Sequence, residues 1–256
     1  MNVVVCVKQV PDPNSAGQLD PSTHNLKRDG ELVLDPGDEF GVEAGLQLAE
    51  KHGGEVTVVS MGPERGVDAV RKALAMGAAK GVLISDGSLA GSDALTTAKV
   101  LAAAIRKLEF DVVITATEST DGYTGVVPQM LAGLLDIPAV TFAKSVSYEG
   151  DTLKVERQTE AGVESVTAKL PVVISVTAGV NEPRYPSLKG IMGAKQKPLD
   201  RPTLADLGVD GLGGASAGQK ITAVEAAPQR AAGEIIKDDG EAAKRIVDFL
   251  AERKVI

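Results

Sequence analysis

The sequence predicts an α/β protein built on a doubly wound, mostly parallel sheet, with an antiparallel addition and an extended C-terminal arm. Short, nearly continuous apolar runs recur along the first two-thirds of the chain, and such runs are typical of strands covered on both faces. Each run is followed by a segment with helical periodicity. Strand and helix alternate about four times, which predicts right-handed crossovers between parallel strands.

The predicted strands of the parallel sheet are rich in β-branched residues, which favour strands. They span residues 3–7, 55–60, 81–84 and 111–115. Ligands of doubly wound sheets bind outside the carboxyl ends of the strands. The loops that leave these runs are therefore where a site is expected.

The intervening helices are predicted from their ends as well as from their apolar stripes. Asp35 is an expected N-cap, with Pro36 at the first helical position and Gly53 at the end of that helix. Three later helices are expected at residues 63–76, 92–108 and 127–134. Their apolar residues recur at steps of three and four, which indicates helices packed on a sheet.

Beyond Pro138 the pattern changes to alternating strands. The turn at 149–151 is acidic and contains glycine, which is typical of a hairpin. The strands are expected at residues 145–148, 152–157, 163–169 and 172–176. Together they are interpreted as an antiparallel addition to the parallel sheet.

No regular structure is predicted directly after Asn181. Residues 208–218 are rich in Gly, Ala and Ser, and residues 241–254 have the pattern of an amphipathic helix. We therefore expect three parts: an α/β domain with its antiparallel addition (1–183), a protruding loop (184–200) and a C-terminal arm (201–256). The arm has too little apolar surface to fold alone and is expected to wrap a partner subunit.

Composition excludes several classes of function. A formal charge of −8, a pI near 4.9, 3% aromatic residues and no Trp argue against nucleic-acid binding. No apolar run is long enough for a membrane span, and the first residues lack the features of a signal peptide. With one Cys and two His, no disulfide or zinc site is expected, and a reducing cytoplasm is the predicted location.

No catalytic motif stands out. The chain has no G-x-S-x-G, no P-loop, no H-E-x-x-H and no G-x-G-x-x-G after the first strand. His24 and His52 are expected to be solvated, and Cys6 is expected to be a small buried side chain of the first strand. We therefore expect no catalytic residues.

The most informative segment is the polar loop after the fourth strand. It contains Ala116, Thr117, Glu118, Ser119, Thr120, Asp121, Gly122, Tyr123, Thr124, Gly125, Val126 and Val127. The loop leads into a helix N-terminus, where free N–H groups and the helix dipole can hold a phosphate. With the turn at 60–63 and Asp35 it predicts a nucleotide site. Ordinary capping by Ser, Thr and Gly in βα loops is an equally weighted alternative.

Four stretches of the sequence resemble the beta subunit of electron-transfer flavoprotein. They are VVVCVKQVPD at 3–12, RKALAMGA at 71–78, VERQTEAGVE followed by LPVVI within 155–174, and NEPRYPSLKGIMGAK at 181–195. The last of these is highly specific. The segment QRAAG at 229–233 is also similar, so the resemblance covers essentially the whole chain.

The resemblance implies an adenine nucleotide alpha hydrolase-like fold and a heterodimer with an alpha subunit that holds most of the FAD. It implies an electron carrier that accepts electrons from flavin dehydrogenases, especially the acyl-CoA dehydrogenases of fatty acid oxidation, and passes them to a membrane quinone oxidoreductase. AMP would be buried in the beta subunit. Carried over by position, its contacts are Cys6, Asp35, Pro36, Gly37, Asp38, Met61 and residues 116–127.

The nucleotide segments depart from the family's usual pattern. Asp35 replaces the usual Asn, and residues 125–127 replace polar side chains of the phosphate loop. Members with a second FAD usually show Asp-Gly-Asp-Thr, and residues 121–124 are Asp-Gly-Tyr-Thr. Because backbone amides can bind phosphate without those side chains, AMP is expected, with a second FAD or no nucleotide as alternatives.

Leu188, Ile191 and Met192 fall at i, i+3 and i+4, so a single helical turn would present them as one apolar knob. The cations expected around it are Lys189, Lys195 and Lys197. The resemblance implies that Leu188 is an anchor in a dehydrogenase pocket. The alternative is a solvated basic loop whose leucine packs into the core.

Two other classes of protein share parts of this pattern. A stand-alone adenine-nucleotide sensor of the stress-protein type would have the same layout, but it does not explain the long arm or the segment 181–195. A nucleotide-dependent ligase or hydrolase is disfavoured by the missing catalytic motifs.

Overall fold

The computed structural model describes residues 1–15, 17–225, 233, 235, 237–238 and 240–256. The chain divides into two compact units, Met1–Thr222 and Ala223–Ile256. The first unit carries every strand and all helices up to α6, and the second carries helix α7 (Ala242–Glu252).

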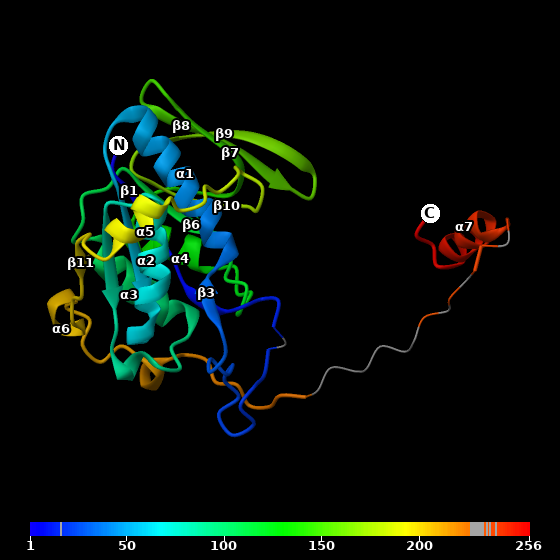
Figure 1. The fold of residues 1–256 in the computed structure, drawn as a ribbon, viewed down its shortest axis with the longest axis horizontal. Coiled ribbons are helices and arrows are strands. Elements are labelled where there is room, and N and C mark those ends of the chain that lie inside the picture. Colours follow the sequence, from blue (N-terminus) through cyan, green and yellow to red (C-terminus); the bar gives the residue numbers. More distant parts are fainter. Residues whose placement is uncertain (16, 226–232, 234, 236, 239) are drawn as a thin grey trace. The chain divides into compact units, whose positions relative to one another are not determined.

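A nine-stranded sheet forms the centre of the first unit, in the order β11-β5-β4-β1-β6-β10-β7-β8-β9 (Figure 1). Its strands are β1 (Val3–Cys6), β4 (Val56–Met61), β5 (Lys80–Ile84), β6 (Val112–Ala116), β7 (Ala139–Glu149), β8 (Thr152–Thr159), β9 (Gly162–Lys169), β10 (Val172–Val176) and β11 (Leu199–Asp200). All pairs from β11 to β7 are parallel, whereas β8 and β9 are antiparallel. The predicted fold class is confirmed.

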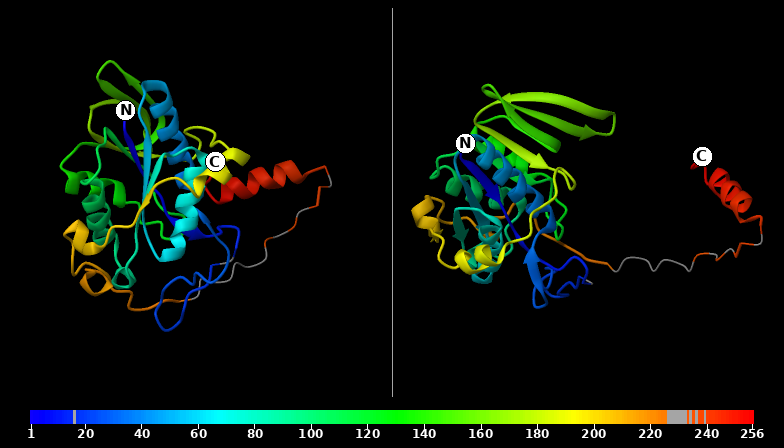
Figure 2. Two further views of the ribbon diagram at one scale, coloured as in Figure 1. Left: turned by 60° about the vertical axis from the view of Figure 1, so that its left-hand side comes forward. Right: turned by 45° about the horizontal axis from the view of Figure 1, so that its top comes forward.

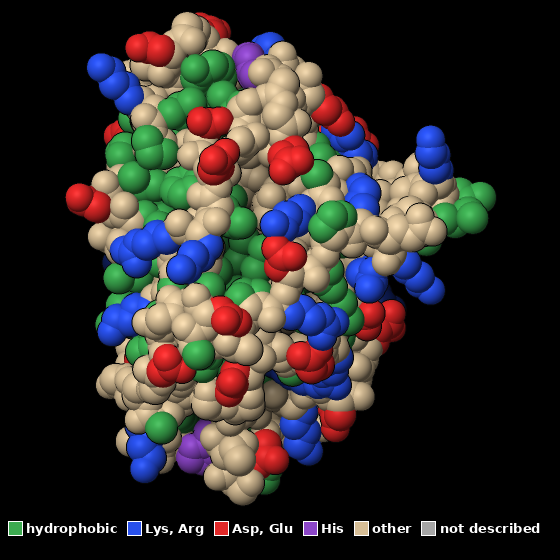
Figure 3. Space-filling view, turned by 90° about the vertical axis from the view of Figure 1, so that its left-hand side faces the viewer, with side chains coloured by type: hydrophobic (Ala, Val, Ile, Leu, Met, Phe, Trp, Pro, Cys, Tyr) green, Lys and Arg blue, Asp and Glu red, His purple; other side chains and the backbone are tan. Residues whose placement is uncertain are grey.

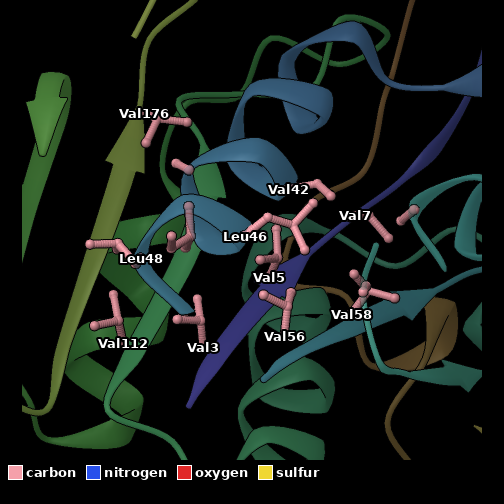
Figure 4. Close-up of a cluster of buried hydrophobic side chains, with 14 of the residues drawn as sticks. Val3, Val5, Val7, Val42, Leu46, Leu48, Val56, Val58, Val112 and Val176 are labelled. Atoms are coloured by element: carbon pink, nitrogen blue, oxygen red, sulfur yellow. The ribbon is translucent and has the colours of Figure 1, made fainter. Parts of the chain in front are cut away.

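Helices cover both faces of the parallel sheet (Figures 1 and 2). The cluster of buried side chains on one face includes α1 (Pro36–His52) and α2 (Val67–Met76), and that on the other includes α3 (Ala94–Ile105) and α4 (Val127–Leu135). Val3 and Val5 of β1 join the first cluster, which Figure 4 shows, and Val4 joins the second. This alternation is what a pleated strand buried on both faces requires.

The winding of the sheet reverses between β1 and β6. The chain passes from β1 through β4 to β5 and then returns to β6, on the other side of β1. Such a reversal leaves a crevice at the carboxyl ends of the two strands. The topology thus fixes where a ligand site is expected.

Helix α1 begins and ends at the residues that the sequence predicts. The Asp35 side chain accepts a hydrogen bond from the Gly37 N–H at 2.9 Å, and Gly53 follows the last helical residue. His52, however, is not solvated as expected. Its Nε2 is buried without a hydrogen-bond partner in the described part of the chain, and its ring meets Tyr148 edge-on at a centroid distance of 5.1 Å.

One strand is placed differently from the prediction. The run 172–176, expected in the antiparallel addition, is the parallel strand β10 between β6 and β7. All of its residues are buried, as in a strand covered on both faces. The addition therefore consists of β8 and β9, which continue from the long strand β7.

The segment after Asn181 contains more regular structure than predicted. Helix α5 (Leu188–Ala194) contains the helical turn considered for 188–192, and it is followed by two elements that were not predicted: β11, which pairs with β5, and α6 (Leu204–Leu207), which has a capping box. These short elements carry too few residues for a periodicity signal. Residues 201–222, which the sequence assigns to the arm, belong to the first unit.

The second unit contains the amphipathic helix predicted at 241–254. In α7 the side chains of Ile246, Val247 and Phe249 are each about half exposed, and such a stripe is typical of a helix that packs on a surface. Residues 229–232 of the family resemblance lie outside the described residues. Among the described residues, none of the helices has the length and apolar character needed to cross a membrane.

Candidate functional site

A cavity of about 370 Å³ opens where the winding of the sheet reverses. Residues at or just beyond the ends of β1, β4 and β6 line it, namely Cys6, Val7, Ser60, Met61, Thr115 and Ala116. Further lining residues come from the first turn of α1, the loop after β5 and the loop before α4. This is the position at which doubly wound sheets bind ligands.

The predicted nucleotide residues converge on this cavity. Those that line it are Cys6, Asp38, Met61, Ala116, Thr117, Glu118, Ser119, Thr124, Gly125 and Val127. The others do not line it, and they are Asp35, Pro36, Gly37, Thr120, Asp121, Gly122, Tyr123 and Val126. Several members of this second group hold the lining residues in place.

Asp35 joins the start of α1 to the loop after β6. Its side chain is fully buried: Oδ1 accepts from the Gly37 N–H, and Oδ2 accepts from the N–H of Thr120 at 2.8 Å and from its hydroxyl at 3.2 Å. A Cβ on Gly37 would lie 3.2 Å from the Cβ of Ala116, so the two segments meet closely. Asp35 therefore positions the wall of the cavity from behind.

Two ionisable groups in the cavity are biased toward their uncharged forms. Burial, with a smaller effect of the Asp38 charge, raises the pKa of the Cys6 thiol to about 12. Burial and then the charge of Asp35 raise the pKa of Asp38 well above its usual range. Asp38 Oδ2 accepts from the Lys8 N–H at 2.7 Å. Cys6 is thus an unreactive lining group, and a protonated Asp38 can donate a hydrogen bond to a ligand.

Three cations line the cavity, and two of them pair with a single buried carboxylate. Asp121, whose side chain is 4% exposed, forms ion pairs with Lys8, at 2.7 Å, and with Arg28. Arg65 donates to the carbonyl oxygen of Arg28. Lys8, Arg28 and Arg65 all line the cavity, so the cavity is suited to an anionic group.

Asp121→Asn is expected to lower the free energy of unfolding at neutral pH by roughly 1–3 kcal/mol. Burial raises the pKa of Asp121, but the charge of Lys8 and hydrogen bonds from Lys8, Arg28 and Ser119 outweigh it and hold the pKa below its usual range. A carboxylate with a lowered folded-state pKa gives stability that is present above its unfolded pKa of about 4 and is lost as the pH falls through the folded value.

Urea unfolding of the purified protein at several pH values between pH 7 and pH 3 measures this effect. On acidification the native chain should lose the stability that the Asp121 ion pairs provide. The variant lacks these ion pairs, so it should show no such loss. Two parallel curves of stability against pH would show that the Asp121 ion pairs contribute nothing to folding.

The loop before α4 can present backbone N–H groups to a ligand. Helix α4 follows Val126, and within the described part of the chain no side-chain hydrogen bond caps its first turn. Gly125 has a φ of +66°. The Gln129 side-chain amide is oriented so that both its oxygen and its nitrogen have hydrogen-bond partners. Its nitrogen then donates to the carbonyl oxygens of Gly125 and Val126 at 3.2 Å. Uncapped N–H groups at a helix start are suited to bind phosphate.

Several lining residues come from segments that the sequence did not single out. The loop after β5 and the start of α3 contribute Leu89, Gly91, Ser92, Asp93, Ala94 and Thr97. This loop could have been included, because it leaves a predicted strand as the other two loops do. Arg28 could not, since it is 93 residues from Asp121 and lies between the short strands β2 (Gln9–Pro11) and β3 (Leu32–Leu34).

A second candidate surface lies on α5. Leu188, Ile191 and Met192 are 75%, 54% and 69% exposed, and Leu188 does not pack into the core. At the protruding right-hand edge of Figure 3, hydrophobic side chains lie beside basic ones. We call these three side chains the apolar knob.

The cations near the knob have different roles. Lys189 and Lys195 are exposed. Lys197 is only partly exposed, and its Nζ donates to two carbonyl oxygens at the end of α2. Arg184 is bound in ion pairs with Glu43 and Glu50. Lys197, one of the cations expected around the knob, is thus bonded to backbone at and just beyond the end of α2.

The sheet order and the cavity at the switch point define a doubly wound α/β protein of the class that binds its ligands at the carboxyl ends of parallel strands. Residues 23–207 match the family model described as electron transfer flavoprotein domain. The chain therefore belongs to the electron transfer flavoprotein family.

Relatives extend this assignment over the full length. The chain is 43% identical to electron transfer flavoprotein subunit beta of Mycobacterium leprae, with 100% of this chain and 99% of the relative covered. It is 41% and 37% identical to the proteins of the same name from Thermoanaerobacterium thermosaccharolyticum and Bacillus subtilis, with both chains fully covered. The family implies association with flavin, and a beta subunit implies an alpha subunit as partner.

Proposed function

We propose that this chain is the beta subunit of a heterodimeric electron carrier. The carrier accepts electrons from acyl-CoA and related flavin dehydrogenases and passes them to a quinone oxidoreductase. The observation that carries the proposal is the similarity to beta subunits over the whole chain. In this proposal the alpha subunit holds most of the FAD, and the apolar face of α7 packs against the alpha subunit.

The cavity at the switch point is proposed to hold AMP. A volume of about 370 Å³ lies at the lower end of the range of roughly 300–1,000 Å³ for small-molecule sites, which favours a mononucleotide over a whole FAD. The phosphate would bind the N–H groups at the start of α4, next to Gly125. The adenine would lie against the strand ends near Cys6 and Met61.

One group opposes a phosphate at this position. The Glu118 carboxylate lies beside Gly125, because a Cβ on Gly125 would be 3.4 Å from its Oε2. A phosphate bound there would be repelled unless the Glu118 side chain turns away or is paired with a cation. Lys8 and Arg28 are already paired with Asp121, so Arg65, which lines the same cavity, would have to supply this cation.

The apolar knob on α5 is proposed to dock in a pocket of the dehydrogenase. An exposed leucine supplies affinity when it is buried in a pocket, while exposed charges such as Lys189 and Lys195 mainly raise the rate of encounter. Contact of this kind dissociates rapidly. A carrier that serves several partners needs that property.

The cofactor content of the purified complex tests the proposal. Expressed alone, the chain should be soluble and nearly colourless, because it has no dinucleotide fingerprint. Co-expressed with its alpha subunit, it should purify as a yellow heterodimer. After denaturation, mass spectrometry should find about one FAD and one AMP per dimer.

Other results would lead to different conclusions. Stoichiometric FAD on the isolated chain would contradict the assignment of FAD to the alpha subunit. Two FAD and no AMP per dimer would replace AMP by a second flavin, a possibility that the sequence Asp-Gly-Tyr-Thr at 121–124 keeps open. A colourless homodimer that binds ATP would favour the nucleotide sensor.

A further inference from the structure

Helix α5 lies so close to α2 that only glycine fits at one of its positions. A Cβ added to Gly190 would lie 2.4 Å from the main-chain oxygen of Ala75. Gly193, in the same helix, has open space where its Cβ would be. The close approach of the two helices therefore requires glycine at 190 and not at 193.

The end of the segment that carries α5 is fixed to the same neighbour. Lys197 Nζ donates to the carbonyl oxygens of Leu74 and Ala78 at 2.8 and 2.7 Å. The Leu74 oxygen lies in the last turn of α2, where the helix dipole favours a cation, and the Ala78 oxygen lies two residues beyond the end of that helix. Arg71 of α2 adds a hydrogen bond to the carbonyl oxygen of Ala194 at 3.2 Å.

The residues that precede α5 are bonded to α1. Arg184 pairs through Nε with Glu43 at 2.7 Å and through Nη1 with Glu50 at 2.6 Å. Asn181 Nδ2 donates to the carbonyl oxygen of Phe40 at 3.0 Å. The segment is thus bonded to α1 before α5, packed on α2 within α5 and bonded to the end of α2 after it. The apolar knob, in contrast, faces solvent.

We propose that α5 is a preorganised docking element, and that Gly190 and Lys197 are positioning residues that place Leu188 without touching the partner. The inference rests on the proposed docking function. A segment already held in its bound conformation loses little conformational entropy on binding, so docking is tighter for the same contacts. The partner surface is an apolar pocket with an acidic rim on a flavin dehydrogenase, because exposed Lys189 and Lys195 flank the knob.

Two glycine variants in the heterodimer test the proposal. Gly190→Ala should move α5 away from α2, whereas Gly193→Ala makes the same chemical change and the same gain in helix propensity without a clash. With one acyl-CoA dehydrogenase as electron donor, Gly190→Ala should raise the KM for the carrier about tenfold with little change in kcat. Gly193→Ala should stay within about twofold of the native KM.

A pair of lysine variants gives an independent test if Gly190→Ala fails to assemble. Lys197→Met removes the two hydrogen bonds to α2, and Lys195→Met removes the same charge from an exposed side chain. We expect Lys197→Met to raise KM about tenfold at any salt concentration. Lys195→Met should raise KM only at low salt, where its charge steers the encounter, and should leave KM near the native value at high salt. FAD content and thermal stability of the heterodimer are measured alongside.

The outcomes separate this inference from the docking function on which it rests. If Leu188→Ala accepts electrons normally, the docking function itself is wrong. If Leu188→Ala is impaired while Gly190→Ala and Lys197→Met have the native KM, docking stands and preorganisation is overturned. A loss of FAD or thermal stability in Lys197→Met that parallels its loss of activity would also overturn the positioning role, because the residue would then act through folding.

Discussion

Leu188→Ala is expected to cut electron transfer from an acyl-CoA dehydrogenase at least about tenfold, which corresponds to roughly 1.4 kcal/mol of lost docking energy. Leu188 is 75% exposed, so its truncation creates no cavity in the core. FAD content, pairing with the alpha subunit and thermal stability should therefore stay unchanged. The measurement is steady-state reduction of the heterodimer by substrate-loaded dehydrogenase over a range of carrier concentrations.

Leu188→Met is the matched control for this prediction. Methionine is an apolar side chain of similar volume that, like leucine, is not branched at Cβ, so the variant should retain most of the activity. If the alanine and methionine variants were both as active as the native carrier, Leu188 would not be a docking residue. Loss of FAD or of thermal stability in the alanine variant would mean instead that the residue is structural.

Gly125→Val is expected to remove the nucleotide from the cavity while FAD stays bound to the alpha subunit. Gly125 has a φ of +66°, which is strained for any residue with a Cβ and most of all for a β-branched one. Relief of the strain, which is of order 1–3 kcal/mol, would shift the N–H groups that are proposed to hold the phosphate. Mass spectrometry of the denatured heterodimer measures the nucleotide that remains.

Gly133→Val is the control for this experiment. Gly133 lies in α4 with open space around it and without a positive φ, so valine there is tolerated. Its nucleotide content should equal that of the native complex. Full occupancy of AMP in Gly125→Val would show that the phosphate does not depend on the turn before α4.

The periodic elements of the fold could be predicted because their side chains report their surroundings. The run at 3–7 is apolar throughout and the run at 111–115 has an apolar centre, and they are the central strands β1 and β6. Asp35 and Gly53 mark the ends of α1 because capping follows local rules. In contrast, the parallel pairing of 172–176 with β6 depends on contacts between distant residues, and no local pattern distinguishes it from an antiparallel partner.

The candidate site was predictable to a similar extent. Loops that leave parallel strands must meet at one edge of the sheet, so Met61 and Ala116 could be placed together from their order alone. The ion pairs of Asp121 with Lys8 and Arg28 could not be predicted. The Arg28 pair depends on how the segment between β2 and β3 folds, and that segment has no regular pattern, while Lys8 is 113 residues from Asp121 in the sequence.

The position of β10 between β6 and β7 affects how the chain folds while it is being synthesised. Strand β6 pairs with β10, and β10 is followed directly by the segment that leads to α5. As the chain leaves the ribosome, β6 keeps one edge unpaired until residues 172–176 have emerged and entered between it and β7. Arg184 and α5 follow that strand in the chain, so they emerge after it and are tethered to it when they pack on α1 and α2. We therefore expect a chain whose sheet has not closed to present no ordered apolar knob, so that only completed carriers engage a dehydrogenase.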